Sequence, residues 1–224
     1  MIGAIFDMDG LLIDSEKLFQ RIWRELAAEA GYTLDDAFAA AMCGSSGKVT
    51  EAVLRRYIPG ADPQALIAEC YRRVIELEKK CIPLKPGAVE ILEGMKRRDF
   101  RTALASSSPL DMIERNLEIT GLTAFFDELV SGFEVQRGKP EPDIFLLAAE
   151  RLGLPSRDCY VFEDSVNGIR AGLAAGCMAV MVPDLVQPTP EVRALCHGVY
   201  PDLSAAWRAI LEEQGIDAEE RGNS

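Results

Sequence analysis

Two aspartates near the N-terminus, Asp7 and Asp9, follow a short apolar run and precede Gly10. The run predicts a buried strand over residues 2–6 that ends in two carboxylates at its C-terminal tip, where open α/β sheets place their active sites. In an extended chain, residues two apart point to the same side, so both carboxylates would face one site. Two like charges held together favour a cation between them, and Mg²⁺ prefers carboxylate and carbonyl oxygens. A simple acidic turn has the same sequence, so the interpretation depends on the residues downstream.

Three serines, Ser106, Ser107 and Ser108, follow a second apolar run, residues 102–105, and precede Pro109. Hydroxyls and backbone N–H groups at the start of a helix can bind an anion the size of phosphate. Ser106, at the expected strand tip, is the better phosphate ligand, with Ser107 beside it. Ser108 is better explained as the N-cap of a helix that opens with the proline.

A lysine and a pair of acids follow in the second half of the chain. Lys139 stands just before two prolines and ahead of a helix expected to start at Pro142, and the prolines would hold it in place. A solvated loop lysine is the alternative. Glu163 and Asp164 follow the apolar run 160–162 and precede a helix. They suit either a metal site at a strand tip or two helix-capping acids.

The elements that would position these residues change along the chain. Residues 15 to about 80 have helical periodicity, whereas from residue 85 onward short apolar runs alternate with amphipathic stretches. The expected strands span residues 2–6, 102–105, 128–130, 160–162 and 178–182, and the later helices span about 88–98, 109–120, 142–152 and 166–175. Repeated β-α alternation predicts a parallel sheet with helices on both faces.

We therefore predict an α/β fold, a Rossmann-like three-layer core with a parallel sheet, plus an inserted all-helical cap domain. The core would comprise residues 1–14 and 84–224, and the cap residues 15–83. The links between them, near residues 12–15 and 82–87, are short and would act as hinges.

Composition excludes several function classes. The 224 residues are 48% hydrophobic and 27% charged, which is typical of a globular protein with a substantial core. A net charge of −12 without any basic block argues against a nucleic-acid polymer as partner. No apolar run approaches the roughly 20 residues of a membrane helix, and no signal-peptide pattern is present. We expect a cytoplasmic monomer, without a membrane partner, whose six cysteines stay reduced.

Together, the motifs resemble those of the haloacid dehalogenase superfamily of phosphoryl-transfer enzymes. Asp7-Met8-Asp9-Gly10, Ser106, Lys139 and Glu163-Asp164 are similar to its four motifs in type, order and strand-tip context. The resemblance spans the whole chain, and the helical insertion is similar to the family's C1-type cap. The residues flanking the third and fourth motifs resemble the subgroup of β-phosphoglucomutase, pseudouridine-5′-phosphatase and sugar-phosphate phosphatases.

The resemblance implies a phosphatase that acts on a small phosphorylated metabolite, a sugar phosphate or a compound like a nucleoside monophosphate. Asp7 would attack phosphorus and form an aspartyl-phosphate. Asp9 would protonate the leaving group and then activate water. Ser106, Ser107 and Lys139 would hold the phosphoryl oxygens.

The cofactor implied by the resemblance is Mg²⁺. Its ligands would be the Asp7 carboxylate, the Asp9 backbone carbonyl and the Asp164 carboxylate, with Glu163 in support. The ion would neutralise the phosphoryl oxygens so that an anionic nucleophile can approach.

Three alternatives remain open. β-Phosphoglucomutases carry a histidine twelve residues beyond the nucleophile, where this chain has Phe19, and the only histidine is His197; this weakens a phosphomutase. The single histidine also argues against a Ser-His-Asp triad or a multi-histidine zinc site. Dehalogenase relatives lack the second aspartate of the first motif, so Asp9 argues against that activity. A non-enzymatic binding module that has kept the fold is the last alternative.

Substrate contacts are expected in the cap. Gly44, Ser45 and Lys48 lie in a turn that commonly faces the active site in this family. The alternative for Lys48 is an ordinary solvated lysine at the start of a helix. Phe19 could pack against a sugar or base, or fill the seam between the two domains.

Overall fold

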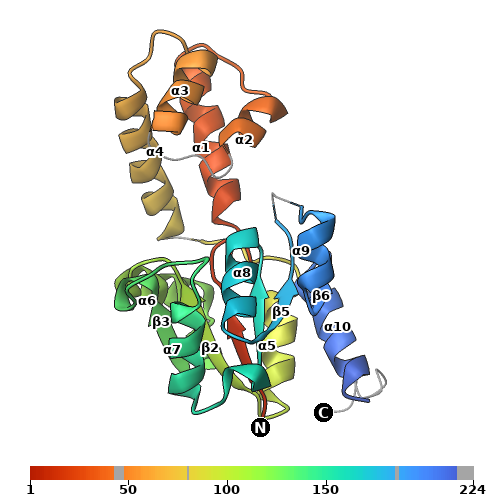
Figure 1. The fold of residues 1–224 in the computed structure, drawn as a ribbon. Helices are drawn as coiled ribbons and strands as arrows, with labels where there is room; N and C mark the ends of the chain where they lie inside the picture. Colours follow the sequence, from red (N-terminus) through yellow and green to blue (C-terminus); the bar gives the residue numbers. More distant parts are fainter. Residues whose placement is uncertain (43–47, 80, 185–186, 216–224) are drawn as a thin grey trace. The chain divides into compact units, whose positions relative to one another are not determined.

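The computed structural model describes residues 1–42, 48–79, 81–184 and 187–215. The chain forms two compact units, one of Met1–Ile13 with Pro83–Ser224 and the other of Asp14–Ile82. Figure 1 follows the chain from the central strand of the first unit into the helices of the second and back. Within the described part of the chain, no helix is long and apolar enough to cross a membrane.

The first unit, the core unit, is built on one parallel sheet in the order β3-β2-β1-β4-β5-β6. Its strands are β1 Gly3–Phe6, β2 Arg101–Ser106, β3 Glu128–Ser131, β4 Cys159–Glu163, β5 Met178–Met181 and β6 Gly198–Val199. The first five were expected, with small differences at their ends. β6 was missed, because a strand of two residues leaves no apolar run in the sequence.

Helices cover both faces of this sheet, as Figure 1 shows. They are α5 Ala88–Lys96, α6 Leu110–Thr120, α7 Asp143–Leu152, α8 Val166–Ala174, α9 Pro190–Leu195 and α10 Leu203–Glu213, with 3₁₀ turns η1 Thr123–Phe125, η2 Gly132–Glu134 and η3 Ser156–Asp158. Ile5 of β1 packs with the buried residues of α7 and α8. Phe6 points to the opposite face and stacks on Phe162 with ring centroids 4.6 Å apart. The predicted α/β fold with a parallel sheet and helical layers is confirmed.

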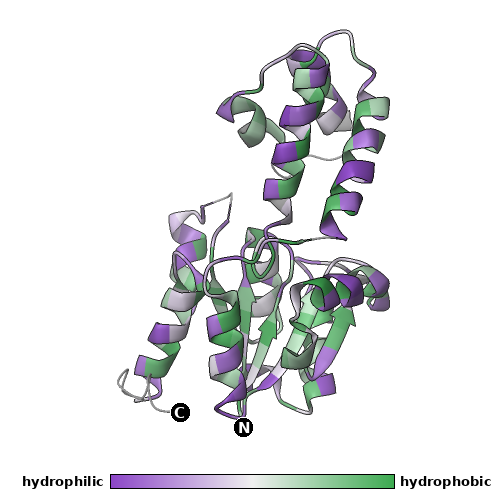
Figure 2. Cartoon of the chain, turned by 180° about the vertical axis from the view of Figure 1, so that it is seen from behind, coloured by the Kyte–Doolittle hydropathy of each residue, from purple (hydrophilic) through white to green (hydrophobic). Residues whose placement is uncertain are grey.

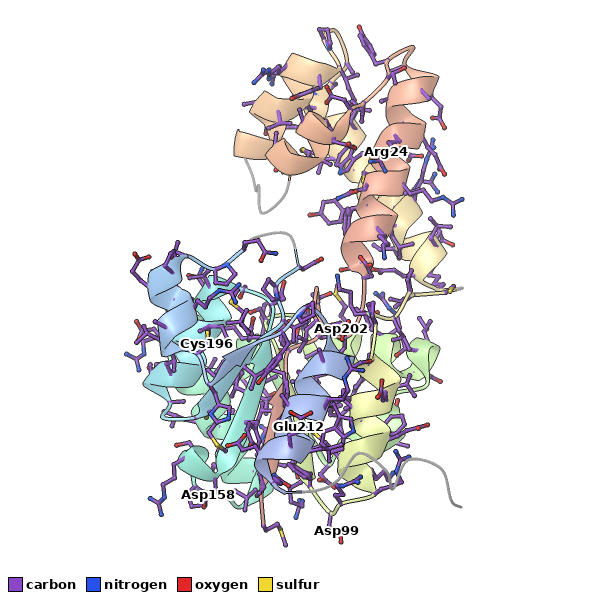
Figure 3. All side chains as sticks on the ribbon, turned by 90° about the vertical axis from the view of Figure 1, so that its right-hand side faces the viewer. Arg24, Asp99, Asp158, Cys196, Asp202 and Glu212 are labelled. Carbon is purple, nitrogen blue, oxygen red and sulfur yellow. The ribbon has the colours of Figure 1, made fainter. Side chains whose placement is uncertain are left out.

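Figure 2 shows the physical basis of this layering, because the strands are apolar along most of their length and the helices carry polar residues on one side. Figure 3 labels Asp99 and Asp158, which precede β2 and β4, at the lower end of the core unit. The C-terminal tips of the parallel strands therefore lie at the opposite edge of the sheet. That edge is where the sequence placed the reactive side chains.

The second unit is entirely helical in its described residues. Its helices are α1 Ser15–Glu29, α2 Asp36–Met42, α3 Lys48–Tyr57 and α4 Pro63–Glu78. Their apolar stripes bury a separate core that includes Ile22, Trp23 and Leu54. The carboxylate of Asp62 caps α4 by accepting from the Gln64 N–H group, and the proline at the first helical position follows it.

Candidate active site

Three neighbouring strands end beside one another at the carboxyl edge of the sheet. Asp7 follows β1, Ser106 ends β2, and Glu163 ends β4 with Asp164 directly after it. β1 lies between the other two, and the Asp7 N–H group donates to the carbonyl of Phe162 at 3.0 Å. The parallel register thus brings together side chains that are far apart in sequence.

Lys139 joins two of the acids directly. Its Nζ lies 2.6 Å from Asp7 Oδ1 and 2.6 Å from Glu163 Oε1, and it also donates to the carbonyl of Ala105 at 3.2 Å. The side chains of all three ion-pair partners are at most 10% exposed. The alternative of a solvated loop lysine is therefore wrong. Burial lowers the pKa of Lys139, but the carboxylates of Asp7 and Glu163 outweigh it, and the pKa is raised.

Glu163 is held on both of its oxygens. While Oε1 accepts from Lys139, Oε2 accepts from the backbone N–H and the hydroxyl of Ser165, at 3.0 and 2.9 Å. The Ser165 hydroxyl in turn accepts from the N–H of Gly168 and caps α8. A Cβ added at Gly168 would lie 1.8 Å from Glu163 Cδ, so only glycine leaves room for this carboxylate. The helix-capping alternative is wrong for Glu163, because Ser165 provides the cap.

A tight turn after β1 brings Gly10 against Asp164. Gly10 has φ +83°, and its N–H donates to the carbonyl of Ile13 at 3.0 Å. A Cβ at this position would lie 2.4 Å from Asp164 Oδ2. Glycine is required here both for the backbone conformation and for the close approach of the carboxylate.

The acids at this edge form a group that could hold a metal ion. Asp7, Glu163 and Asp164 each offer a carboxylate oxygen, and these oxygens lie within 4.8 Å of one another. Burial raises the pKa of Asp7 to about 7, although Lys139 partly opposes it. Burial, followed by the charges of Glu163 and Asp7, raises the pKa of Asp164 to about 8. The single positive charge of Lys139 does not balance the negative charges of three carboxylates, so a bound cation fits this set of oxygen donors.

The serines at the tip of β2 differ in what they contact. Ser106 is buried and its Oγ accepts from the Ser108 N–H at 3.1 Å, so its own proton is available to another acceptor. Ser107 is exposed. Ser108 does not cap the following helix, because the N-cap of α6 is Pro109 and no side chain bonds there. Its hydroxyl lies 3.1 Å from Asp9 Oδ2 instead, so the expected capping role is wrong.

The cap residues proposed from sequence can be placed only in part. Phe19 lies on α1, half-buried, and packs edge-to-face on Tyr71 at 5.3 Å between ring centroids. Lys48 is the first residue of α3, and its side chain is not among those that the structure describes. Gly44 and Ser45 lie outside the described residues.

Ser131 was missed by the sequence analysis. It ends β3 opposite Ser106 in the register, is 1% exposed, and donates its hydroxyl to the carbonyl of Ser108 at 2.7 Å. The sequence did contain a signal for it. Residue 131 directly follows the strand expected over 128–130, and the C-terminal tips of parallel strands lie at the same edge of a sheet.

Comparison with known proteins agrees with this geometry. The profile of the haloacid dehalogenase-like hydrolase family matches residues 3–176, which include all four motifs. The chain belongs to this family. Hexitol phosphatase A of Escherichia coli is 33% identical to this hydrolase over 201 residues, covering 88% of this chain and 91% of that protein. A Drosophila melanogaster protein named probable pseudouridine-5′-phosphatase is 36% identical over 190 residues, 81% of each chain.

Solved structures give the same assignment. A haloacid dehalogenase family hydrolase from Deinococcus radiodurans, with bound phosphate and sodium, has a TM-score of 0.82 at 28% identity and covers 97% of this hydrolase and 98% of that chain. A β-phosphoglucomutase from Clostridium difficile shares the fold, with a TM-score of 0.64 at 23% identity and coverage of 96% and 98%. The predictions of the superfamily and of a phosphoric monoester hydrolase are confirmed.

Proposed function

We propose that this hydrolase is a Mg²⁺-dependent phosphatase that acts on a small sugar phosphate or hexitol phosphate through an aspartyl-phosphate. The observation that carries the proposal is the buried contact of Lys139 with both Asp7 and Glu163 beside Asp164. It holds a carboxylate at the tip of the central strand, next to a cation and a group of metal-binding oxygens. The same four motif positions fall within the matched family region.

In the first half-reaction, a carboxylate oxygen of Asp7 attacks phosphorus and the bond from phosphorus to the ester oxygen breaks. Asp9 gives its proton to the departing alkoxide, which leaves as an alcohol. In the second half-reaction, Asp9 takes a proton from water, the water oxygen attacks phosphorus, and Asp7 is released with inorganic phosphate. Lys139 and Ser106 would donate to the phosphoryl oxygens throughout.

The Asp7 carboxylate, the Asp9 backbone carbonyl and the Asp164 carboxylate would hold the metal. Glu163 is better suited to support than to ligation, because both of its oxygens already accept hydrogen bonds. When bound, Mg²⁺ would supply positive charge to the phosphoryl oxygens.

The relatives favour a phosphorylated sugar derivative as substrate, since hexitol phosphatase A matches over most of both chains. A nucleoside-like phosphate is the second choice, because of the likeness to the pseudouridine-5′-phosphatase. A panel of hexitol phosphates, sugar phosphates and nucleoside monophosphates, assayed for phosphate release with Mg²⁺, tests the function. Failure on every phosphomonoester, including p-nitrophenyl phosphate, would refute it.

Metal removal provides the first specific prediction. Mg²⁺ at about 100 times its dissociation constant should stabilise the native state by about 2.7 kcal/mol and raise the Tm measurably. EDTA should abolish both this rise and phosphate release. The Tm of the Asp164→Asn variant should no longer rise with Mg²⁺, whereas that of Asp158→Asn, changed at the opposite edge of the sheet, should rise as in the wild type. Activity that survives complete chelation would contradict the metal site.

The second prediction separates hydrolysis from intramolecular transfer. With Phe19 where β-phosphoglucomutases carry histidine, we expect little glucose 6-phosphate from β-glucose 1-phosphate, even with catalytic glucose 1,6-bisphosphate. A coupled assay for glucose 6-phosphate measures this directly. Fast conversion that depends on the bisphosphate would replace the phosphatase by a phosphomutase.

A further inference from the structure

The hydroxyl of Ser108 is a polar group of the site that the proposed reaction does not use. It does not cap α6, whose N-cap is Pro109. It lies 3.1 Å from Oδ2 of Asp9 and donates to that carboxylate. A serine has only one hydroxyl proton, so the proton donated to Asp9 cannot also be donated to a substrate oxygen.

The backbone of Ser108 is fixed from two strands. Its N–H donates to Ser106 Oγ at 3.1 Å, and its carbonyl accepts from Ser131 Oγ at 2.7 Å. Both partners are 1% exposed and lie opposite each other in the β2–β3 register. A Cβ at Gly132 would lie 3.0 Å from the Cα of Ser107, so the two strand tips approach closely. Ser108 is thereby held at a defined distance from the β1 tip.

We propose that Ser108 is a positioning residue that orients the carboxyl group of Asp9 for proton transfer. A carboxyl group is planar and turns about a single bond, so a hydrogen bond to Oδ2 also fixes the direction of the other oxygen. A general acid must lie within about 2.6–3.2 Å of the atom that it protonates, and misorientation lowers its efficiency. This inference rests on the proposed role of Asp9.

A series of hydrogen bonds runs across the tips of three neighbouring strands. The Ser131 hydroxyl at the end of β3 binds the Ser108 carbonyl after β2, and the Ser108 hydroxyl binds the Asp9 carboxylate after β1. Ser106, at the end of β2, binds the Ser108 N–H group. The acid is thus positioned by residues of strands other than its own. Loss of the Ser108 hydroxyl should leave Asp9 present but without the hydrogen bond that orients Oδ2.

The test compares Ser108→Ala with the wild-type enzyme on two substrates. One is an alkyl sugar phosphate that the wild type hydrolyses, whose poor leaving group needs the proton; the other is p-nitrophenyl phosphate, whose leaving group needs it little. In single-turnover measurements, we expect the rate of aspartyl-phosphate formation to fall about tenfold with the alkyl ester, because hydrogen bonds to charged groups contribute this much, and less than about threefold with the aryl ester. KM should change little on either.

Matched variants separate positioning from structure. Ser108→Thr keeps the hydroxyl and should restore most of the alkyl activity. Ser156→Ala removes a serine hydroxyl from η3, just before β4 at the opposite edge, and should behave as wild type. If Ser108→Ala does not fold, Ser131→Ala should show the same dependence on the leaving group, since it releases the Ser108 carbonyl.

Two results would overturn the positioning role while leaving the phosphatase in place. One is an equal fall in the rate of aspartyl-phosphate formation on both substrates, and the other is a rise in KM without a fall in that rate, which would make Ser108 a substrate ligand. A wild-type enzyme without any phosphatase activity would instead overturn the proposed function, and this inference with it.

Discussion

Asp7→Asn is expected to abolish turnover, with kcat lower by at least about 10⁴-fold, as for other enzymes that lose their nucleophile. An amide nitrogen or oxygen does not form a stable bond to phosphorus under these conditions. The amide has nearly the shape of the carboxylate, and its oxygen can still accept from Lys139. Far-UV circular dichroism and the Tm should therefore show a folded protein. Steady-state phosphate release measures the loss.

The control for this variant is Asp158→Asn, an identical change of residue type at the opposite edge of the sheet. It should retain wild-type activity. An Asp7→Asn enzyme that keeps more than about one per cent of the wild-type kcat would contradict the role of Asp7 as nucleophile. Phosphorylated wild-type protein, trapped by rapid acid quench and absent from the variant, would give independent support.

Asp9→Asn is expected to have the second largest effect, and the effect should depend on the leaving group. General acid catalysis contributes about 10²–10⁴-fold, so kcat on an alkyl phosphate should fall by this factor. On p-nitrophenyl phosphate, formation of the intermediate should be slowed far less. Because the same residue activates water, the aspartyl-phosphate should accumulate in this variant.

The measurement is single-turnover kinetics on both substrates, with intact-mass analysis of the protein after quenching. Asp158→Asn again serves as the matched control, and it should neither slow either substrate nor accumulate phosphoprotein. Equal slowing of aryl and alkyl phosphates in the first step would show that Asp9 is not the acid. Absence of phosphoprotein together with slow hydrolysis would show that it is not the base.

Much of the fold was predictable because short apolar runs and helical periodicity are local signals. The helix expected from about residue 142 to 152 is found as Asp143–Leu152. The start of a helix is harder to predict: α2 begins at Asp36, and the Asp35 carboxylate accepts from the Phe38 N–H group, although Thr33 lies close by in the sequence. Asp, Ser and Thr compete for such positions, and local sequence does not decide which one caps.

The sequence by itself determined the class of chemistry. Carboxylates and a serine stand at the ends of strand-like runs, and a parallel sheet must bring such ends to one edge. That argument predicted a common site for Asp7, Ser106 and the Glu163-Asp164 pair, whereas the family resemblance added Lys139, which lies 132 residues from Asp7 in the chain. It did not require any knowledge of side-chain conformation.

Only the tertiary structure decided which partner each group has. From sequence, Ser108 had the ordinary features of a helix cap, and Glu163 could equally be a ligand or a cap. In the fold, the Ser108 hydroxyl reaches Asp9, while Lys139 and Ser165 take both oxygens of Glu163. A hydrogen bond is fixed by distances of a few tenths of an ångström and by direction. Such distances depend on how β1, β2, β3 and β4 pack together, which residue spacing along one chain does not specify.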